Sequence, residues 1–202
     1  MNLVIVRHAL PVRRIAEQGA AADPELTELG VRQAAATAEW LAAESFDAVY
    51  TSPLLRARQT AEPIAARHGL EVRVEDGIAE YDRQSEFYIP IEEVKASDDP
   101  ELKAHWRALA EDRLEDVVAD AHTFKPRVSE AFERLIASHP GGKVLAVCHG
   151  GVINVALGWI LDLPRMLWFE PGYASIHRVA ASRSGIKSIV SINETGHLRG
   201  IE

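Results

Sequence analysis

The sequence predicts a three-layer α/β/α fold around a mostly parallel central sheet. Short apolar runs rich in β-branched residues recur along the chain, and such runs are typical of strands that are buried on both faces. Helical patterns lie between these runs, and this alternation indicates helices packed on both faces of a parallel sheet. A chain of 202 residues has the length of one sizeable domain, so we predict a single domain over residues 1–202.

The first three elements follow from local patterns. Residues 3–6 form a continuous apolar run, which predicts a first buried strand. Thr27 is a suitable N-cap, and the helical spacing after it, which includes Trp40, predicts a helix that ends near Phe46. Residues 47–51 predict a second short strand.

The next helix is expected to start at Ser52 and Pro53, because Ser caps a helix and Pro fits its first turn. It should end near Gly69, and residues 70–74 alternate as a strand does. Residues 83–125 are more polar, and we interpret them as an excursion from the core with two weaker helical patterns. The remaining expected elements are a helix over residues 127–138, a strand over 143–148, an apolar helix from 150 to about 161, and strands over 174–181 and 186–192.

Composition and charge exclude several classes of function. The chain has 22 Lys and Arg against 30 Asp and Glu, a net charge of -8. Such a field repels phosphate backbones and anionic lipids, so we expect neither nucleic-acid nor membrane binding. The single cysteine, Cys148, excludes an intrachain disulfide framework and a Cys-rich zinc site. The longest apolar stretch, residues 152–161, is too short to span a bilayer, and we expect a soluble cytoplasmic protein.

Polar sequences follow three of the predicted strands. They are Arg7-His8, the segment from Ser52 to Arg56, and His149-Gly150-Gly151. Ligand sites of open α/β sheets gather at the carboxyl ends of parallel strands, so two histidines and two arginines can converge there.

Phosphoryl transfer through a histidine needs this set of residue types. A neutral imidazole attacks phosphorus, and nearby guanidinium groups favour the neutral form because they disfavour a second positive charge. Arginines and fixed donors stabilise the charge on the equatorial oxygens. A carboxylic acid must protonate the departing oxygen and then activate water.

The sequence resembles the histidine phosphatase superfamily, which includes the cofactor-dependent phosphoglycerate mutases. The matching stretches are Val6-Arg7-His8, Leu26-Thr27-Glu28-Leu29-Gly30, the eleven residues from Thr51 to Ala61, and Val147-Cys148-His149-Gly150-Gly151. They span most of the chain and are jointly very specific.

The resemblance implies a role for each matching residue. His8 would be the phosphoacceptor, and Arg7, Arg56 and His149 would hold the phosphoryl group, with the backbone at Gly150 beside them. Glu80 falls where the family places its proton donor, although Asp76, Asp82 and Glu86 lie close to it in sequence. The family needs no metal, and we expect no cofactor for this chain.

Two features depart from the family pattern. Ala9 follows the Arg-His pair where Gly is usual, and its methyl group is tolerable only if its φ suits an L-residue. Leu10, Pro11 and Arg14 replace the Glu, the Ser or Thr, and the Asn of the mutases. The second departure favours hydrolysis over mutase activity.

For the other candidate residues, a structural role is as compatible with the sequence as a functional role, or more so. We expect residues 83–125 to form a cap over the active site. Five residues are candidates for the mouth of the pocket: Arg13, Arg14, Tyr88, Trp106 and Arg107. Surface charge and packing within the cap explain these residues equally well. A thiol-phosphatase reading of Cys148 fails because Asn154 stands where that mechanism needs an arginine. Cys148 is expected to be a small buried residue, and the six remaining histidines show no paired metal-ligand spacing.

The first functional hypothesis is a metal-independent phosphomonoesterase that acts on a small phosphorylated molecule through a phosphohistidine. The alternatives are a phosphoglycerate mutase-type phosphomutase, a phosphatase that acts on phosphohistidine or phosphotyrosine in proteins, and a non-catalytic phosphate-binding or interaction module. The sequence indicates no oligomeric state.

Overall fold

The computed structural model describes residues 1–17, 19–118 and 121–201 of the chain. Its central strands are β1 (Asn2–Arg7), β3 (Ala48–Thr51), β4 (Val72–Val74), β6 (Lys143–Cys148), β7 (Ile176–Ala181) and β8 (Lys187–Glu194). Within the described residues they form one six-stranded sheet in the order β4-β3-β6-β1-β7-β8. The first four in this order are parallel, and β7 and β8 add an antiparallel edge.

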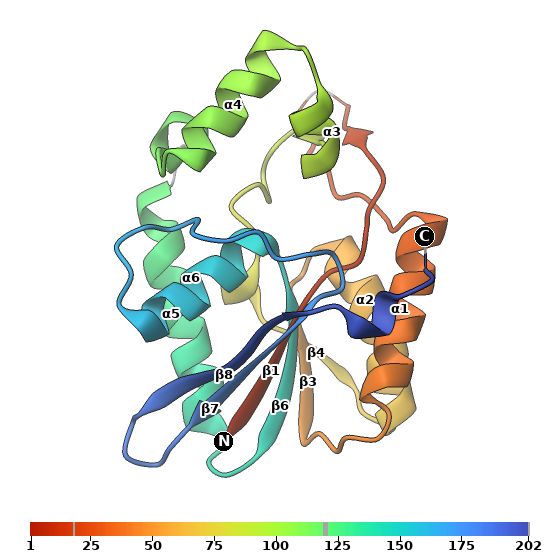
Figure 1. Ribbon diagram of the computed structural model, residues 1–202, viewed down its shortest axis with the longest axis vertical. Helices are drawn as coiled ribbons and strands as arrows, with labels where there is room; N and C mark the ends of the chain where they lie inside the picture. Colours follow the sequence, from red (N-terminus) through yellow and green to blue (C-terminus); the bar gives the residue numbers. More distant parts are fainter. Residues whose placement is uncertain (18, 119–120, 202) are drawn as a thin grey trace.

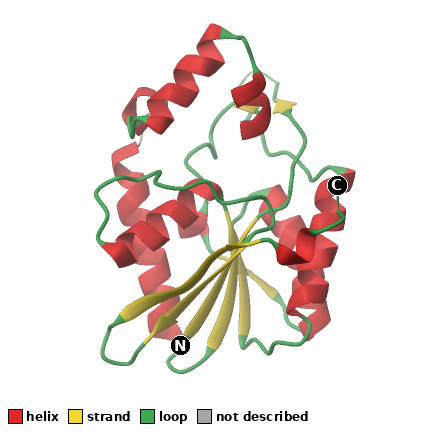
Figure 2. Ribbon diagram, in the orientation of Figure 1, coloured by secondary structure: helices red, strands yellow, loops and turns green. Residues whose placement is uncertain are grey.

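Helices cover both faces of this sheet, as Figures 1 and 2 show. Helices α1 (Glu28–Leu41) and α2 (Leu55–His68) lie on one side, and α5 (Ala121–Ser138) and α6 (Gly150–Leu161) lie on the other. The predicted three-layer fold class is therefore confirmed.

Alternation along β1 explains why both faces need a cover. Leu3 and Ile5 pack in a cluster with Phe132 of α5, whereas Val4 and Val6 pack in a second cluster with Leu41 of α1. Successive strand side chains point to opposite faces, so a strand that is apolar at every position requires helices on both sides.

The excursion lies beyond the carboxyl ends of the parallel strands (Figure 1). It carries α3 (Ile91–Ala96), α4 (Pro100–Ala110) and the short strand β5 (Phe87–Tyr88), which pairs with β2 (Arg14–Ile15). Asp99 caps α4 by accepting from the backbone N–H groups of Glu101 and Leu102, and Pro100 occupies its first turn. Three short 3-10 helices complete the described elements: η1 (Asp76–Ile78), η2 (Leu114–Asp116) and η3 (Gly196–Leu198).

Several predicted boundaries differ from those observed. Helix α2 begins at Leu55, and its first N–H is capped by Asp23 Oδ1 at 2.8 Å, so the predicted start at Ser52 and Pro53 is wrong. Helix α5 begins at Ala121, six residues before the predicted start, with a proline inside it. Thr27 caps α1 as predicted, but Trp40 is 53% exposed.

None of the helices in the described part of the chain is long and apolar enough to cross a membrane.

Candidate active site

The strand register brings the predicted motifs together at one edge of the sheet. Arg7 pairs with Cys148 across β1 and β6, and Thr51 pairs with Val147 across β3 and β6. The next residues after these strands therefore leave the sheet side by side. The His8 N–H donates to the Cys148 carbonyl at 2.8 Å, and the rings of His8 and His149 lie 5.0 Å apart.

His8 is buried and its tautomer is fixed. Its Nδ1 lies 2.8 Å from the Ala9 carbonyl oxygen, which can only accept, so Nδ1 carries the hydrogen and Nε2 keeps its lone pair. Burial lowers the pKa of His8 well below its usual value, and the positive charges of Arg56 and Arg7 lower it further. The imidazole is therefore neutral at physiological pH.

Unpartnered nitrogen atoms surround this imidazole. Within the described residues, Arg7 Nε, both Nε and Nη1 of Arg56, and His149 Nδ1 are buried without a hydrogen-bond partner. Buried polar groups are normally paired, so a cluster of unpaired donors indicates a missing acceptor. Two guanidinium groups in the cluster make an anion the fitting ligand.

The other contacts of the two arginines fix their positions. Arg7 donates from Nη1 to the Pro171 carbonyl at 2.6 Å, and its guanidinium lies 3.8 Å from the centre of the Tyr173 ring. Arg56 is 1% exposed and donates from Nη2 to both oxygens of Asp82, at 2.9 and 3.2 Å. The unpaired nitrogens are thus held in place before any ligand arrives.

His149 occupies the N-cap position of α6, and its side chain makes no capping hydrogen bond. Its Nε2 lies 2.7 Å from Ser52 Oγ, and its pKa is lowered by burial and by Arg56, His8 and Arg7. Gly150 follows at the start of the helix and lines the cavity described below. The free N–H groups and positive dipole end of a helix N-terminus add to the attraction for an anion.

Glu80 is the carboxylic acid that the fold directs inward. It is 6% exposed, and its Oε2 accepts from the Gly151 N–H at 2.8 Å while its Oε1 accepts from the Tyr81 N–H at 3.1 Å. Burial and the negative charge of Asp82 raise the pKa of Glu80 to about 7, against the opposing effect of those two hydrogen bonds. Asp76 and Glu86 are exposed, and Asp82 is bound to Arg56.

The segment before Glu80 is clamped from α5. Arg127 donates to the carbonyls of Asp76, Gly77 and Ala79 at 2.9–3.1 Å. Three bonds from one guanidinium to successive backbone oxygens hold this turn, and they fix where the Glu80 side chain starts.

Ala9 fits the position that is usually Gly in the family that the sequence resembles. It is fully buried, and it is not among the described residues with a positive φ. Its N–H donates to Thr60 Oγ1 at 3.0 Å, and its methyl group packs with Leu26 and Ala34. The left-handed residue near His8 is Ala174 instead, with φ 54° and an N–H that donates to the His8 carbonyl at 3.2 Å.

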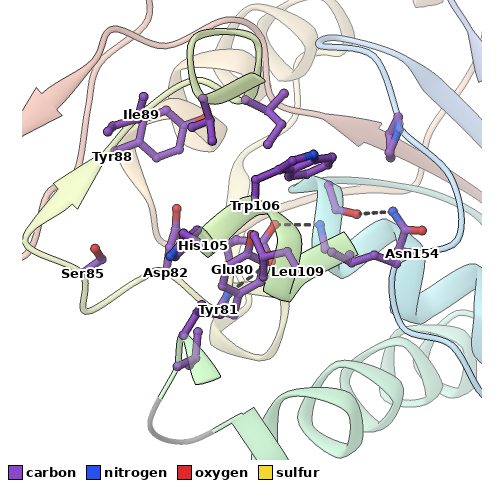
Figure 3. A pocket seen from close by; sticks show the side chains of 18 of the residues that line it. Glu80, Tyr81, Asp82, Ser85, Tyr88, Ile89, His105, Trp106, Leu109 and Asn154 are labelled. Atoms are coloured by element: carbon purple, nitrogen blue, oxygen red, sulfur yellow. Dashed lines mark hydrogen bonds between the residues drawn. The ribbon is translucent and has the colours of Figure 1, made fainter. Parts of the chain in front are cut away.

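A cavity of about 780 Å³ opens above these residues. Arg7, His8, Arg56, Glu80 and Gly150 all line it. Tyr88 and Trp106 of the excursion also line it, and Figure 3 shows Trp106 between Tyr88 and Asn154.

Three other candidates for the pocket mouth do not line this cavity. Arg13 lies 3.7 Å from Glu93, and Arg14 pairs with Glu25 at 3.0 Å. The side chains of both arginines are more than two-fifths exposed, and Arg14 lies in β2, which pairs with β5 as a small separate sheet. Arg107 lies on the exposed face of α4. We therefore correct the expectation that Arg13 and Arg14 line the pocket.

The structure adds four residues that sequence reasoning did not place in the site. Ser52 contacts His149 instead of capping a helix, Asp82 holds Arg56, and Tyr173 stacks on Arg7. Asn154 fixes the loop after α6: its amide donates to the Gly150 and Phe169 carbonyls, and its oxygen accepts from the Trp168 and Phe169 N–H groups. The position of Ser52 at a strand end could have identified it as a site residue from the sequence. Tyr173 and Asn154 contact residues that are distant in sequence, so no local pattern identifies them.

Cys148 is fully buried, as predicted, and burial raises the pKa of its thiol. In the part of the chain that the structure describes, no group of three or more His, Cys, Asp or Glu side chains could hold a metal ion.

Comparisons with known proteins show the family of this chain. The model of the histidine phosphatase superfamily (branch 1) matches residues 3–195. A bifunctional protein of Mycobacterium tuberculosis is 30% identical over 210 residues, which cover 98% of this chain and 55% of that protein. The chain thus spans about half the length of this relative.

Two named phosphatases are also similar. Glucosyl-3-phosphoglycerate phosphatase of Mycobacterium tuberculosis is 35% identical over 164 residues, which cover 72% of this chain and 68% of that protein. The crystal structure of phosphoserine phosphatase from Entamoeba histolytica, in complex with 3-phosphoglyceric acid, has a TM-score of 0.75 at 22% identity and covers 98% of both chains. The family match over residues 3–195 shows that this chain belongs to the histidine phosphatase superfamily.

Proposed function

We propose that the chain is a phosphatase that hydrolyses a phosphomonoester through a covalent phosphohistidine on His8. One observation carries the proposal: a neutral, buried His8 lies among unpaired nitrogen atoms of Arg7, Arg56 and His149. These donors match the three non-bridging oxygens of a phosphoryl group. The names of the similar phosphatases support the same reaction class.

In the first step, the Nε2 lone pair of His8 attacks phosphorus and the bond from phosphorus to the leaving oxygen breaks. Arg7 and Arg56 stabilise the charge on the equatorial oxygens. If Ser52 donates its hydroxyl hydrogen to His149 Nε2, the ring proton of His149 stays on Nδ1 and is available to the phosphoryl group. Glu80 gives its proton to the leaving oxygen, which departs as an alcohol.

In the second step, the Glu80 carboxylate takes a proton from a water molecule as that water attacks the phosphohistidine. The P–N bond breaks, inorganic phosphate forms, and His8 and protonated Glu80 are restored. A pKa of about 7 suits a group that must be an acid in one step and a base in the next.

The test is hydrolysis of p-nitrophenyl phosphate in EDTA by wild type, His8→Ala and His122→Ala. His122 is exposed and does not line the cavity, so its replacement controls for loss of a histidine. We expect activity in wild type and His122→Ala, near-complete loss in His8→Ala, and an acid-labile phosphoenzyme that only His8→Ala lacks.

Full activity in His8→Ala would overturn the proposal. If the phosphoenzyme forms but its phosphoryl group passes from a bisphosphoglycerate primer to 3-phosphoglycerate instead of to water, the chain is a mutase.

A further inference from the structure

The cavity is much larger than its phosphoryl end requires. Its volume of about 780 Å³ falls within the range of roughly 300–1,000 Å³ that is usual for drug-sized ligands. Arg7, His8, Arg56 and Glu80 make up only part of its lining. The rest of the space is therefore left for the leaving group.

The walls of this remaining space combine aromatic and aliphatic side chains with polar ones, which include Gln84, Ser85 and His105. Prominent among the lining side chains are Tyr88, Leu102, Trp106, Leu109, Phe124 and Phe169. They come from β5, α4, α5 and the loop after α6, so four separate segments supply an apolar surface to one cavity. Figure 3 shows Tyr88, Trp106 and Leu109 around the same opening.

Trp106 is held before a ligand binds. The Lys95 ammonium lies 5.0 Å from the centre of its ring and pairs with Glu170 at 2.5 Å. This chain of contacts joins α3, α4 and the loop after α6 around the ring. A ring that is already fixed loses little conformational entropy when a ligand packs against it.

Two cations in the wall are already committed to the backbone. Arg127 donates to the carbonyls of Asp76, Gly77 and Ala79, and Arg165 donates to the Ala110 carbonyl. Arg83 also lines the cavity, from an exposed position. A small leaving group with its own carboxylate would need such a cation near the phosphoryl end, and it would leave the apolar walls uncovered.

We propose that the substrate is the phosphomonoester of a bulky, ring-bearing alcohol, whose ring packs against Trp106 and the apolar walls. This inference rests on the proposed phosphatase function and names its substrate class. Two effects make the free energy of binding more favourable: the ligand removes apolar surface from water, and its ring stacks on Trp106.

The test compares three alkyl phosphates whose leaving oxygens are similar: naphthylmethyl phosphate, ethyl phosphate and phosphoserine. They offer a bulky ring, a small neutral group and a small charged group. We expect kcat/KM for naphthylmethyl phosphate to exceed that for each of the other two by about tenfold or more, which corresponds to one good aromatic contact.

Trp106→Ala should raise KM for naphthylmethyl phosphate about tenfold and leave the constants for ethyl phosphate unchanged. Trp106→Phe should restore most of the affinity. Trp40→Ala is the matched control, because Trp40 is an exposed helical tryptophan outside the cavity lining. The inhibition constant of inorganic phosphate should be the same in all these variants. Equal constants would show that the phosphate-binding residues are intact.

The outcomes separate the two proposals. If phosphoserine is the best substrate and Arg83→Ala abolishes its advantage, the ring-bearing substrate class is wrong while the phosphatase function stands. If ethyl phosphate is hydrolysed as well as naphthylmethyl phosphate, the same conclusion follows. If wild type hydrolyses p-nitrophenyl phosphate but none of the three alkyl phosphates, the substrate class is wrong while the phosphatase function stands. If wild type hydrolyses p-nitrophenyl phosphate no faster than His8→Ala does, the phosphatase function fails and this inference fails with it.

Discussion

At the residue scale, burial moves the pKa values of His8 and Glu80 in opposite directions. A low-dielectric environment disfavours the charged form of each group, which is the protonated imidazole for His8 and the ionised carboxylate for Glu80. The same physical cause therefore yields a free lone pair on His8 and a proton on Glu80 near neutral pH.

This opposition predicts the pH dependence of the reaction. Glu80 donates only when protonated, so kcat/KM for an alkyl phosphate should fall as pH rises through about 7. The limb that reports His8 protonation should lie well below pH 6.5, because the pKa of His8 is lowered. Kinetics of wild type between acidic and alkaline pH would measure both limbs.

Replacing the acid tests its assignment. Glu80→Gln keeps an oxygen for the Gly151 N–H but cannot donate a proton, so the alkaline limb should vanish and the rate should fall by about 10²–10⁴-fold. The kcat/KM for p-nitrophenyl phosphate should be affected much less, since this constant reports the first step and the leaving group needs no proton there. An unchanged alkaline limb in this variant would assign the proton to another group.

Ala9 gives a stability prediction at the same scale. Ala9→Gly removes a fully buried methyl group and adds backbone freedom to the unfolded chain, so it should lower the free energy of unfolding by about 1–2 kcal/mol. Urea denaturation would measure this change, and kcat should stay near the wild-type value because the Ala9 N–H bond to Thr60 is kept. A stabilised Ala9→Gly variant would show that the methyl group is strained.

At the element scale, the first turn of α6 serves both the phosphoryl group and the acid. A Cβ at Gly150 would lie 3.6 Å from Arg7 Nε, which is an ordinary contact. A Cβ at Gly151 would lie 2.5 Å from Glu80 Oε1 and 3.0 Å from the Tyr81 ring. Any side chain at Gly151 would therefore displace the Glu80 carboxyl group.

These adjacent glycines form a matched pair of variants. Gly151→Ala should reduce kcat for alkyl phosphates at least about tenfold and move the alkaline limb of the pH profile, because Glu80 loses its place. Gly150→Ala should retain most of the activity and the wild-type profile. Equal losses in the two variants would mean that helix strain, and not displacement of Glu80, causes the effect.

At the scale of the whole molecule, the site concentrates positive charge within an acidic chain. The net charge is -8, yet Arg7 and Arg56 lie together with unpaired nitrogen atoms beside two neutral histidines. Folding has therefore brought like charges together, and an anion should stabilise the folded state by pairing with them.

Inorganic phosphate should accordingly raise the melting temperature. At about 100 times its Kd it contributes about 2.7 kcal/mol, which corresponds to a rise of roughly 5–10 °C for a chain of this size. Arg56→Met should lose this response, and His122→Ala should keep it. Differential scanning fluorimetry with chloride at matched ionic strength is the measurement, and a full response in Arg56→Met would contradict the assignment of that arginine.

Much of the fold was predictable because its signals are local. The apolar run of β1, the Thr27 cap and the left-handed Gly69 each depend on a few neighbouring residues, and the structure confirms all three. Ser52 misled the prediction because its local role as a cap competes with a partner 97 residues away, and Asp23 supplies the cap instead.

The sequence by itself determined the order of strands and helices and the motifs at three strand ends, because alternation, capping and strand-end placement are properties of short segments. Only the tertiary structure decided that Glu80 is buried and Asp76 exposed, that Arg13 and Arg14 do not line the cavity, and that Asn154 and Tyr173 contact the site. These outcomes depend on which surfaces pack together and so exclude water from particular side chains. Burial of that kind, which sets the pKa values of His8 and Glu80, is a property of the assembled fold and not of any segment.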